Sequence, residues 1–227
     1  RLPMGPPKER KKFGALYTHL KYKLDWDEPW RVGEHPDVVV TFDNGGHRFV
    51  FWRGANYIPN WVTENAIWYN NEFMESWIPG IVGSFEPMSD KQCRYSHVRV
   101  IENHDARVVI HWRYALCDVD YQIAWPDDGT GWGDWADEYY VIYPDAVGVR
   151  KMTCHSSHWG PNVVRDTDDA GHEWHEGIVV YHAHSRPEES LELDAVHVSN
   201  MDGEVGVWSW DQPGQPTTPT PDNANIV

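Results

Sequence analysis

Residues 95–115 read YSHVRVIENHDARVVIHWRYA, and this stretch decides the fold. Apolar and polar residues alternate on both sides of a central turn, ENHDA, at residues 102–106. Alternation with a period of two is typical of half-buried strands, so the stretch predicts an antiparallel hairpin. With the turn centred on His104, the expected cross-strand pairs are Arg99 with Val109, His97 with His111, and Tyr95 with Arg113.

The two faces of this hairpin differ in chemistry. Because side chains alternate across a strand, one face carries the apolar residues of a core and the other a polar set. The polar set consists of Tyr95, His97, Arg99, His111 and Arg113. Arginine binds carboxylate or sulfate, and histidine moves protons near neutral pH, so this face is the candidate catalytic site. The alternative is a solvated face whose cations pair with Asp or Glu of a neighbouring strand.

Similar apolar runs recur along the chain. Strands are predicted at residues 37–42, 47–52, 97–102, 107–116, 138–143, 147–152, 177–184 and 192–198. Turn signals rich in Asp, Asn and Gly separate several of them, as at residues 43–46, 127–129 and 202–203. Regularly spaced short strands favour an all-β fold, either an antiparallel β-sandwich or a jelly roll, with long aromatic-rich loops.

The two ends of the chain differ in composition from its middle. Residues 1–12 are basic and proline-rich, and residues 212–227 are rich in Pro, Thr and Asn. Both read as an arm, tail or linker that has little to bury. We therefore expect one β-sandwich domain over residues 13–211, attached to other domains of a longer chain.

The run at residues 49–77, FVFWRGANYIPNWVTENAIWYNNEFMESW, mixes aromatic rings with hydrogen-bonding side chains. Such a mixture suits a sugar, whose apolar face lies on an aromatic ring and whose hydroxyls need donors and acceptors. We expect a long ordered loop at residues 61–77, since loops of that length are usually functional. The alternative is that the rings are ordinary core residues. The candidate substrate-binding residues are Trp52, Arg53, Asn56, Tyr57, Trp61, Glu64, Asn65, Trp68 and Glu72.

Composition excludes several classes of partner. The 35 acidic and 19 basic residues give a net charge of −16, which opposes binding to nucleic acid or to an anionic membrane surface. The 14 Trp and 11 Tyr among 227 residues are typical of recognition surfaces. Three cysteines without CxxC spacing allow at most one disulfide and indicate no zinc site.

Two more segments carry candidate chemistry. The run HEWHE at residues 172–176 is not HExxH, and on a strand its two histidines face opposite ways, so a general acid or base is favoured over a metal site. The run GWGDWADEYY at residues 131–140 mixes indoles with carboxylates. Its Asp134, Asp137 and Glu138 are candidates for sugar hydroxyls or for calcium, the one cofactor considered. The alternative is a hairpin loop whose tryptophans pack on the sandwich.

Four stretches carry a family resemblance. They are FDNGGHRFVFWRGANYIPNWVTEN at 42–65, WYNNEF at 68–73, YSHVRVIENHDARVVIHWRYAL at 95–116 and GWGDWADEYYVIYPDAVGVRK at 131–151. They resemble a β-sandwich region of large secreted polysaccharide-degrading proteins, namely polysaccharide lyases of the ulvan and uronic-acid glycan type. The resemblance implies a secreted or extracellular domain that acts on an acidic polysaccharide by β-elimination at a uronic acid.

Elimination at a uronate needs a group that neutralises the carboxylate, a base, and an acid for the leaving oxygen. The hairpin offers all three. The candidates are Arg99 or Arg113 as neutraliser with Arg53 as a further clamp, His97 or His111 as base, and Tyr95 or Tyr57 as acid. Hydrolysis by a carboxylate pair is the rival chemistry, with Glu64, Glu72, Glu173 and Glu176 as candidates. A non-catalytic glycan-binding module and a structural or assembly domain are the two non-enzymatic alternatives.

Overall fold

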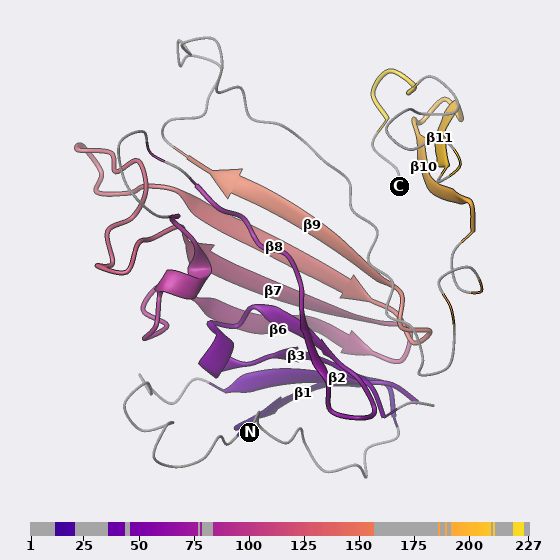
Figure 1. Cartoon of the computed structure of the whole chain (residues 1–227), viewed down its shortest axis with the longest axis horizontal. Coiled ribbons are helices and arrows are strands. Elements are labelled where there is room, and N and C mark those ends of the chain that lie inside the picture. The colour runs from indigo at the N-terminus through magenta and orange to yellow at the C-terminus, as the bar shows by residue number, and fades with distance from the viewer. Residues whose placement is uncertain are drawn as a thin grey trace. The chain divides into compact units, whose positions relative to one another are not determined.

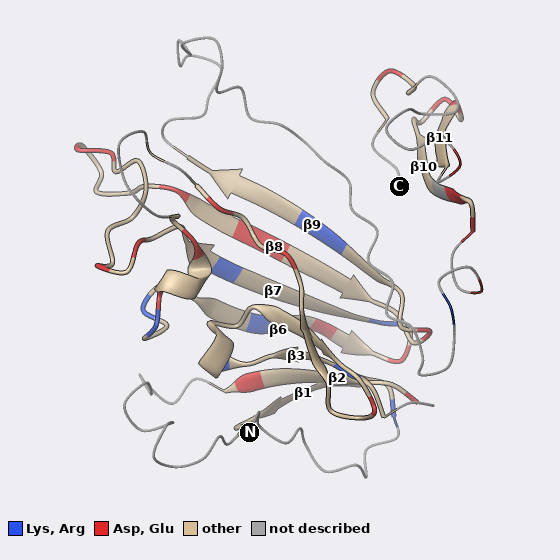
Figure 2. Cartoon of the chain, in the orientation of Figure 1, with Lys and Arg blue, Asp and Glu red and all other residues tan. Residues whose placement is uncertain are grey.

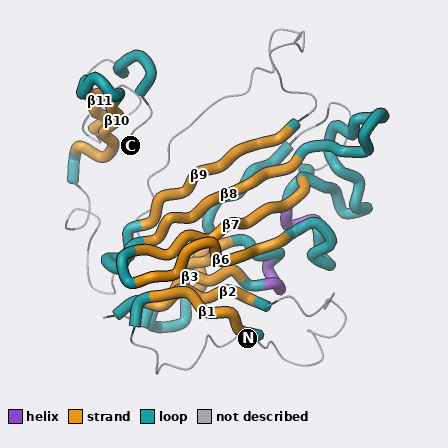
Figure 3. The backbone as a smooth tube through the Cα atoms, turned by 180° about the vertical axis from the view of Figure 1, so that it is seen from behind, coloured by secondary structure: helices purple, strands orange, loops and turns teal. Residues whose placement is uncertain are grey.

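The computed structural model describes residues 12–20, 36–43, 46–76, 78, 84–156, 186, 189, 192–209, 211 and 220–224. The chain divides into two compact units, Arg1–Val164 and Arg165–Val227, which we describe one at a time. Nearly all regular structure in the described residues is β-strand (Figure 3), so the all-β prediction is confirmed. The predicted strand at 177–184 and the candidate residues 172–176 lie outside the described residues. The predicted domain boundaries stay predictions.

The first unit begins with a five-stranded antiparallel sheet. Its strands follow the chain in order: β1 (Gly14–Thr18), β2 (Asp37–Thr41), β3 (Arg48–Phe51), β4 (Pro59–Val62) and β5 (Trp68–Asn70). A short 3-10 helix, η2 (Arg53–Ala55), joins β3 to β4. The expectation of one long loop over residues 61–77 is wrong in part. The backbone of Trp61 pairs with that of Tyr69, which makes β4 and β5 a hairpin.

A four-stranded antiparallel sheet forms the other layer of this unit. Its strands are β6 (His97–His104), β7 (Arg107–Ala115), β8 (Trp135–Ile142) and β9 (Gly148–His155). A second 3-10 helix, η3 (Pro87–Ser89), precedes it. Both sheets are meanders in which neighbours in sequence are neighbours in space (Figure 1). Of the two predicted architectures, this order is that of a β-sandwich, because a jelly roll is built from two Greek keys.

The hairpin of β6 and β7 forms, but the predicted register is wrong. His97 pairs with Arg113 and Arg99 with His111, and the register shifts between Val100 and Glu102. The extra residue there turns Asn103 towards β1, where its side chain accepts a hydrogen bond from Ala15 N and donates one to Ala15 O, each of 2.9 Å. Those two bonds hold the bulge in place.

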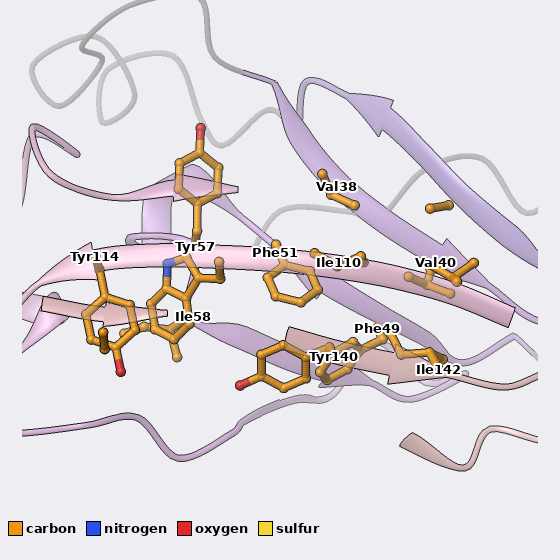
Figure 4. Packing of buried hydrophobic residues seen from close by; sticks show 14 of the residues in the cluster. Val38, Val40, Phe49, Phe51, Tyr57, Ile58, Ile110, Tyr114, Tyr140 and Ile142 are labelled. Atoms are coloured by element: carbon orange, nitrogen blue, oxygen red, sulfur yellow. The ribbon is translucent and has the colours of Figure 1, made fainter. Parts of the chain in front are cut away.

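The core lies between the two sheets. Val38, Val40, Phe49 and Phe51 of the five-stranded sheet pack in one cluster with Ile110, Trp112, Tyr114, Tyr140 and Ile142 of the four-stranded sheet. Figure 4 shows side chains from both layers meeting in this cluster. Aromatic rings make much of the contact, as between Phe49 and Tyr140, whose centroids are 5.5 Å apart. The apolar face predicted for the hairpin is therefore the buried one.

One carboxylate lies inside this core. Glu138 is fully buried, and its oxygens accept hydrogen bonds from Tyr114 Oη at 2.6 Å and Tyr140 Oη at 2.5 Å. Arg150 binds it in a fork, with Nε and Nη2 at 2.7 and 2.9 Å. Burial, followed by the negative charge of Glu138, raises the pKa of both tyrosines well above the usual value. The network satisfies a charge that would otherwise be costly to bury.

The second unit contains a hairpin of β10 (Asp194–Ser199) and β11 (Val205–Ser209). Asn200 organises its turn by accepting hydrogen bonds from the backbone N–H groups of Asp202 and Glu204. Across the described part of the chain we find no helix of the length and apolarity that a membrane crossing requires. Cys93, Cys117 and Cys154 are all free thiols.

Candidate functional site

The outer face of the four-stranded sheet carries a polar cluster centred on Asp137. Figure 2 shows the acidic segment of β8 with basic segments on β7 and β9 at either side of it. The register pairs Arg113 with Asp137, and it makes His111 of β7 and His155 of β9 diagonal neighbours of the same carboxylate. Diagonal positions on one face lie within reach of long side chains, so all three converge on Asp137.

Hydrogen bonds run across all four strands with a defined polarity. Arg99 Nε lies 3.0 Å from His111 Nδ1, and His111 Nε2 lies 2.5 Å from Asp137 Oδ1. An arginine nitrogen only donates, so Nδ1 of His111 is the acceptor and the imidazole is neutral. The proton of His111 is then on Nε2 and is donated to Asp137. This assigns the tautomer of His111 from its neighbours.

The other oxygen of Asp137 faces solvent-accessible partners. Oδ2 lies 2.8 Å from His155 Nε2 and 3.4 Å from Arg113 Nη1. The His155 side chain is 53% exposed, whereas that of His111 is 7% exposed. With Nε2 directed at the carboxylate, Nδ1 of His155 is the nitrogen that can accept a proton. A carboxylate that orients an exposed imidazole in this way is a common arrangement for general bases.

The cluster fixes the charge of Asp137. Burial acts to raise the pKa of this carboxyl, but it is outweighed by opposing effects, of which the hydrogen bond from His111 and the charge of Arg113 are the largest. The pKa therefore lies below its usual value, and Asp137 is an anion at neutral pH.

A depression of about 490 Å³ opens beside this cluster. Arg113, Trp132, Trp135 and His155 are among its lining residues. The guanidinium of Arg113 lies over the Trp135 ring, with Cζ 5.4 Å from the centroid, and the Trp132 and Trp135 centroids are 5.5 Å apart. One site thus combines a cation, an oriented imidazole and two indoles.

The structure brings three of the five predicted hairpin residues together: Arg99, His111 and Arg113. His97 lies on the same face, opposite Arg113. Tyr95 turns away from the cluster, because its hydroxyl donates to the backbone carbonyl of Tyr121 at 3.3 Å. His111 is buried and bonded at both ring nitrogens. His155 takes its place as the exposed imidazole.

The predicted sugar-binding residues at 52–72 do not join this site. They belong to the five-stranded sheet and its loops, whereas the cluster lies on the face of β6–β9 that points away from that sheet. Arg53, Asn56 and Tyr57 are buried, while Trp52, Trp61 and Trp68 are half-buried against core clusters. Glu64, Asn65 and Glu72 are exposed. Most aromatic rings of this run therefore pack in or against the core, whereas Tyr69 is exposed, and sugar binding by the run stays a prediction.

Calcium has no site on the predicted carboxylates. Asp137 faces outwards, Glu138 faces into the core, and Asp134 accepts a hydrogen bond from Ser76 Oγ at 2.8 Å. Neighbours on a strand point to opposite faces, which keeps Asp137 and Glu138 apart. Within the described residues, no group of three or more His, Cys, Asp and Glu side chains is arranged to hold a metal ion.

Sequence reasoning did not place Asp137 and His155 in this cluster. Asp137 was a candidate only for hydroxyls or calcium, and His155 was not a candidate at all. A signal for both existed in the sequence. Once β8 is aligned with β7 and β9 with β8, the alternation of side chains puts Asp137 and His155 on the same outer face as His111 and Arg113. The alignment, however, depends on turns whose lengths the residue pattern does not fix.

Comparison of the chain with protein-family models, with curated proteins and with solved structures finds no match. The fold and site define an antiparallel β-sandwich with a His–Asp–His–Arg cluster on one outer face.

Proposed function

We propose that this chain is a carbohydrate-active domain that binds an acidic polysaccharide on the outer face of β7–β9 and cleaves it by β-elimination at a uronic acid. One observation carries the proposal: exposed His155 is oriented by Asp137 beside the cation Arg113, in a depression lined by indoles. An extracellular location and attachment to further domains are part of the same proposal.

The chemistry follows from the positions of these groups. Arg113 binds the C5 carboxylate and withdraws charge from it, which makes the proton on C5 more acidic. His155 Nδ1 takes that proton, the electron pair forms a C4=C5 double bond, and the bond from C4 to the glycosidic oxygen breaks. In a syn elimination the resulting imidazolium returns the proton to the leaving oxygen. Asp137 stabilises the imidazolium in between.

The indoles supply the binding component. Sugar rings stack their apolar C–H faces on aromatic side chains, and the exposed fraction of Trp132 is 56%. The side chain of Arg113 is 40% exposed, so its guanidinium is available to a carboxylate as well as to Asp137. These features favour an anionic sugar over a neutral one.

A direct assay tests the proposal. The purified chain is incubated with alginate, pectate and ulvan, and formation of the unsaturated product is followed by its ultraviolet absorbance. We expect signal on at least one uronate polymer and none on a neutral polymer such as xylan. Absence of product from every uronate polymer, with binding intact, would refute the lyase and leave a glycan-binding module, the reading that the aromatic lining favours next.

A further inference from the structure

A row of aromatic side chains extends from the depression along one end of the four-stranded sheet. The centroids of Trp132 and Trp135 are 5.5 Å apart, those of Trp135 and Tyr95 5.9 Å, and those of Tyr95 and Tyr121 6.5 Å. The guanidinium of Arg94 stacks on the far ring, 3.9 Å from the Tyr121 centroid. We call Trp132, Trp135, Tyr95 and Tyr121 the aromatic row.

We propose that the aromatic row, with Arg94 at its far end, is an extended subsite for the sugar units that flank the cleaved bond of an acidic oligosaccharide. This inference rests on the proposed function and adds to it a preference for long substrates. The row shares Trp132 and Trp135 with the depression at His155, so a chain bound in the depression continues onto the row.

The segments that carry the row are tied together by their backbones. Leu116 N donates to Asp134 O at 2.9 Å, Asp134 N to Ala124 O at 2.8 Å, and Ala124 N to Leu116 O at 2.8 Å. Between them, a Cβ on Gly133 would lie 2.3 Å from Ala124 O, so only glycine permits this approach. The loops that present Tyr121 and Trp132 are therefore joined directly to the ends of β7 and β8.

Tyr121 itself is held in an unusual conformation. Its φ is +66°, in the left-handed region that non-glycine residues adopt at a cost. A tight turn maintains it: Tyr121 N donates to Asp118 O at 3.0 Å, and the Asp118 carboxylate accepts from Asp120 N and Gln122 N, each at 2.9 Å. Those bonds occupy the Asp118 carboxylate. They also fix the Tyr121 ring between Tyr95 and Arg94.

Charge indicates the class of ligand. The two cations on the row, Arg113 over Trp135 and Arg94 over Tyr121, lie towards its two ends. A polymer with anionic groups on separate sugar units can meet both, whereas a single uronate meets only one. Rings preorganised in this way bind flanking units with little loss of side-chain entropy.

Calorimetry with short and long oligouronates tests the row. We expect the wild-type chain to bind long oligouronates more tightly than the disaccharide. Tyr121→Ala and Trp132→Ala should each weaken binding of the long ligands about 2- to 10-fold, and Tyr121→Ala should leave the disaccharide unchanged. Ile67→Ala is the control, because Ile67 is exposed in the turn between β4 and β5 and its removal should leave both affinities unchanged.

The outcomes separate the row from the elimination chemistry. If Tyr121→Ala weakens short and long ligands equally, or weakens neither, the row is overturned even where unsaturated product forms. If the length preference is lost in the variants but no polymer yields product, the row stands and elimination fails. A wild-type chain that binds no oligouronate overturns the row as well. Trp132→Ala is the second variant because the Trp132 side chain is largely exposed, so its removal should not disturb folding.

Discussion

Asp137 Oδ2 lies 2.8 Å from Nε2 of His155, and this contact joins strands β8 and β9 on the outer face of the sandwich. The same carboxylate receives His111 through its other oxygen. The buried contact with His111 therefore fixes the Asp137 carboxylate, and the exposed contact orients the imidazole of His155.

Replacement of the exposed imidazole should abolish most activity. We expect His155→Gln to lower kcat about 10²- to 10⁴-fold, the usual contribution of a general base. His104→Gln is a matched control, because the His104 side chain is also 53% exposed and lies next to the β6–β7 turn, paired with Glu102. Initial rates on the best uronate polymer measure both. Equal losses in the two variants would remove His155 from the mechanism.

Asp137→Asn should change how stability depends on pH. The folded pKa of Asp137 lies below the unfolded value of about 3.9, so its stabilisation is complete above that pH and is lost as the pH falls through the folded pKa. We expect the variant to lose about 1.5–3 kcal/mol at neutral pH, the contribution of hydrogen bonds to a charged group. Urea unfolding across pH measures it. A gap between the two proteins that widens as the pH falls below about 4 would contradict the prediction.

The buried pair of Glu138 and Arg150 gives a third prediction. Glu138→Gln leaves Arg150 without its charged partner, which typically costs about 3–5 kcal/mol, and the value should fall near the lower end because the Arg150 side chain is 20% exposed. The double variant Glu138→Gln, Arg150→Met should be more stable than the sum of the single changes implies. Chemical denaturation of all four proteins closes this cycle, and strict additivity would show that the two groups do not interact.

Gly133 should tolerate no side chain. Gly133→Ala places a Cβ against Ala124 O and the Ile123 side chain, so we expect a loss of about 1–3 kcal/mol and weaker binding of long oligouronates. Gly148→Ala is the control, since a Cβ there meets nothing closer than 4.0 Å. Thermal unfolding and calorimetry compare the two variants. Unchanged stability in Gly133→Ala would mean that the loop does not depend on this contact.

The buried thiols of Cys93 and Cys117 should be less reactive than the thiol of an exposed cysteine. Burial raises the pKa of Cys93 to about 12 and that of Cys117 to about 12, so little thiolate forms at pH 8. We expect both to resist iodoacetamide in the folded protein and to react on unfolding in urea. Mass spectrometry of the labelled peptides measures this. Rapid labelling of Cys117 under native conditions would contradict its burial.

Several elements were predictable because their residues carry a local signal. The alternation in residues 95–115 predicted β6 and β7, and the apolar runs at 37–42 and 47–52 predicted β2 and β3. The alternation of side chains along each strand also placed Arg99, His111 and Arg113 on one face. That prediction is confirmed, because shifting the pairing by an even number of residues leaves each side chain on the same face of the sheet. The register failed because the turn consists of Asp105 and Ala106, with His104 paired to Arg107, and is not centred on His104.

The aromatic residues at 52–68 show the opposite case. Composition marked them as a sugar-binding wall, but Tyr57 is buried in the core and Trp61 packs against the same cluster. An aromatic ring carries no local signal for core or ligand, since both environments are apolar. Only the pairing of the strands decided which rings remained accessible.

The sequence by itself determined the β-class, the position of the main hairpin and the chemistry of its polar face, because these depend on alternation between neighbouring residues. The tertiary structure decided which carboxylate and which imidazole complete that face. Asp137 and His155 meet only when β8 aligns beside β7 and β9 beside β8, and turn lengths and packing set that alignment. It also decided that Tyr95 lies in the aromatic row and not in the polar cluster. The Tyr95 hydroxyl donates a hydrogen bond to the backbone carbonyl of Tyr121.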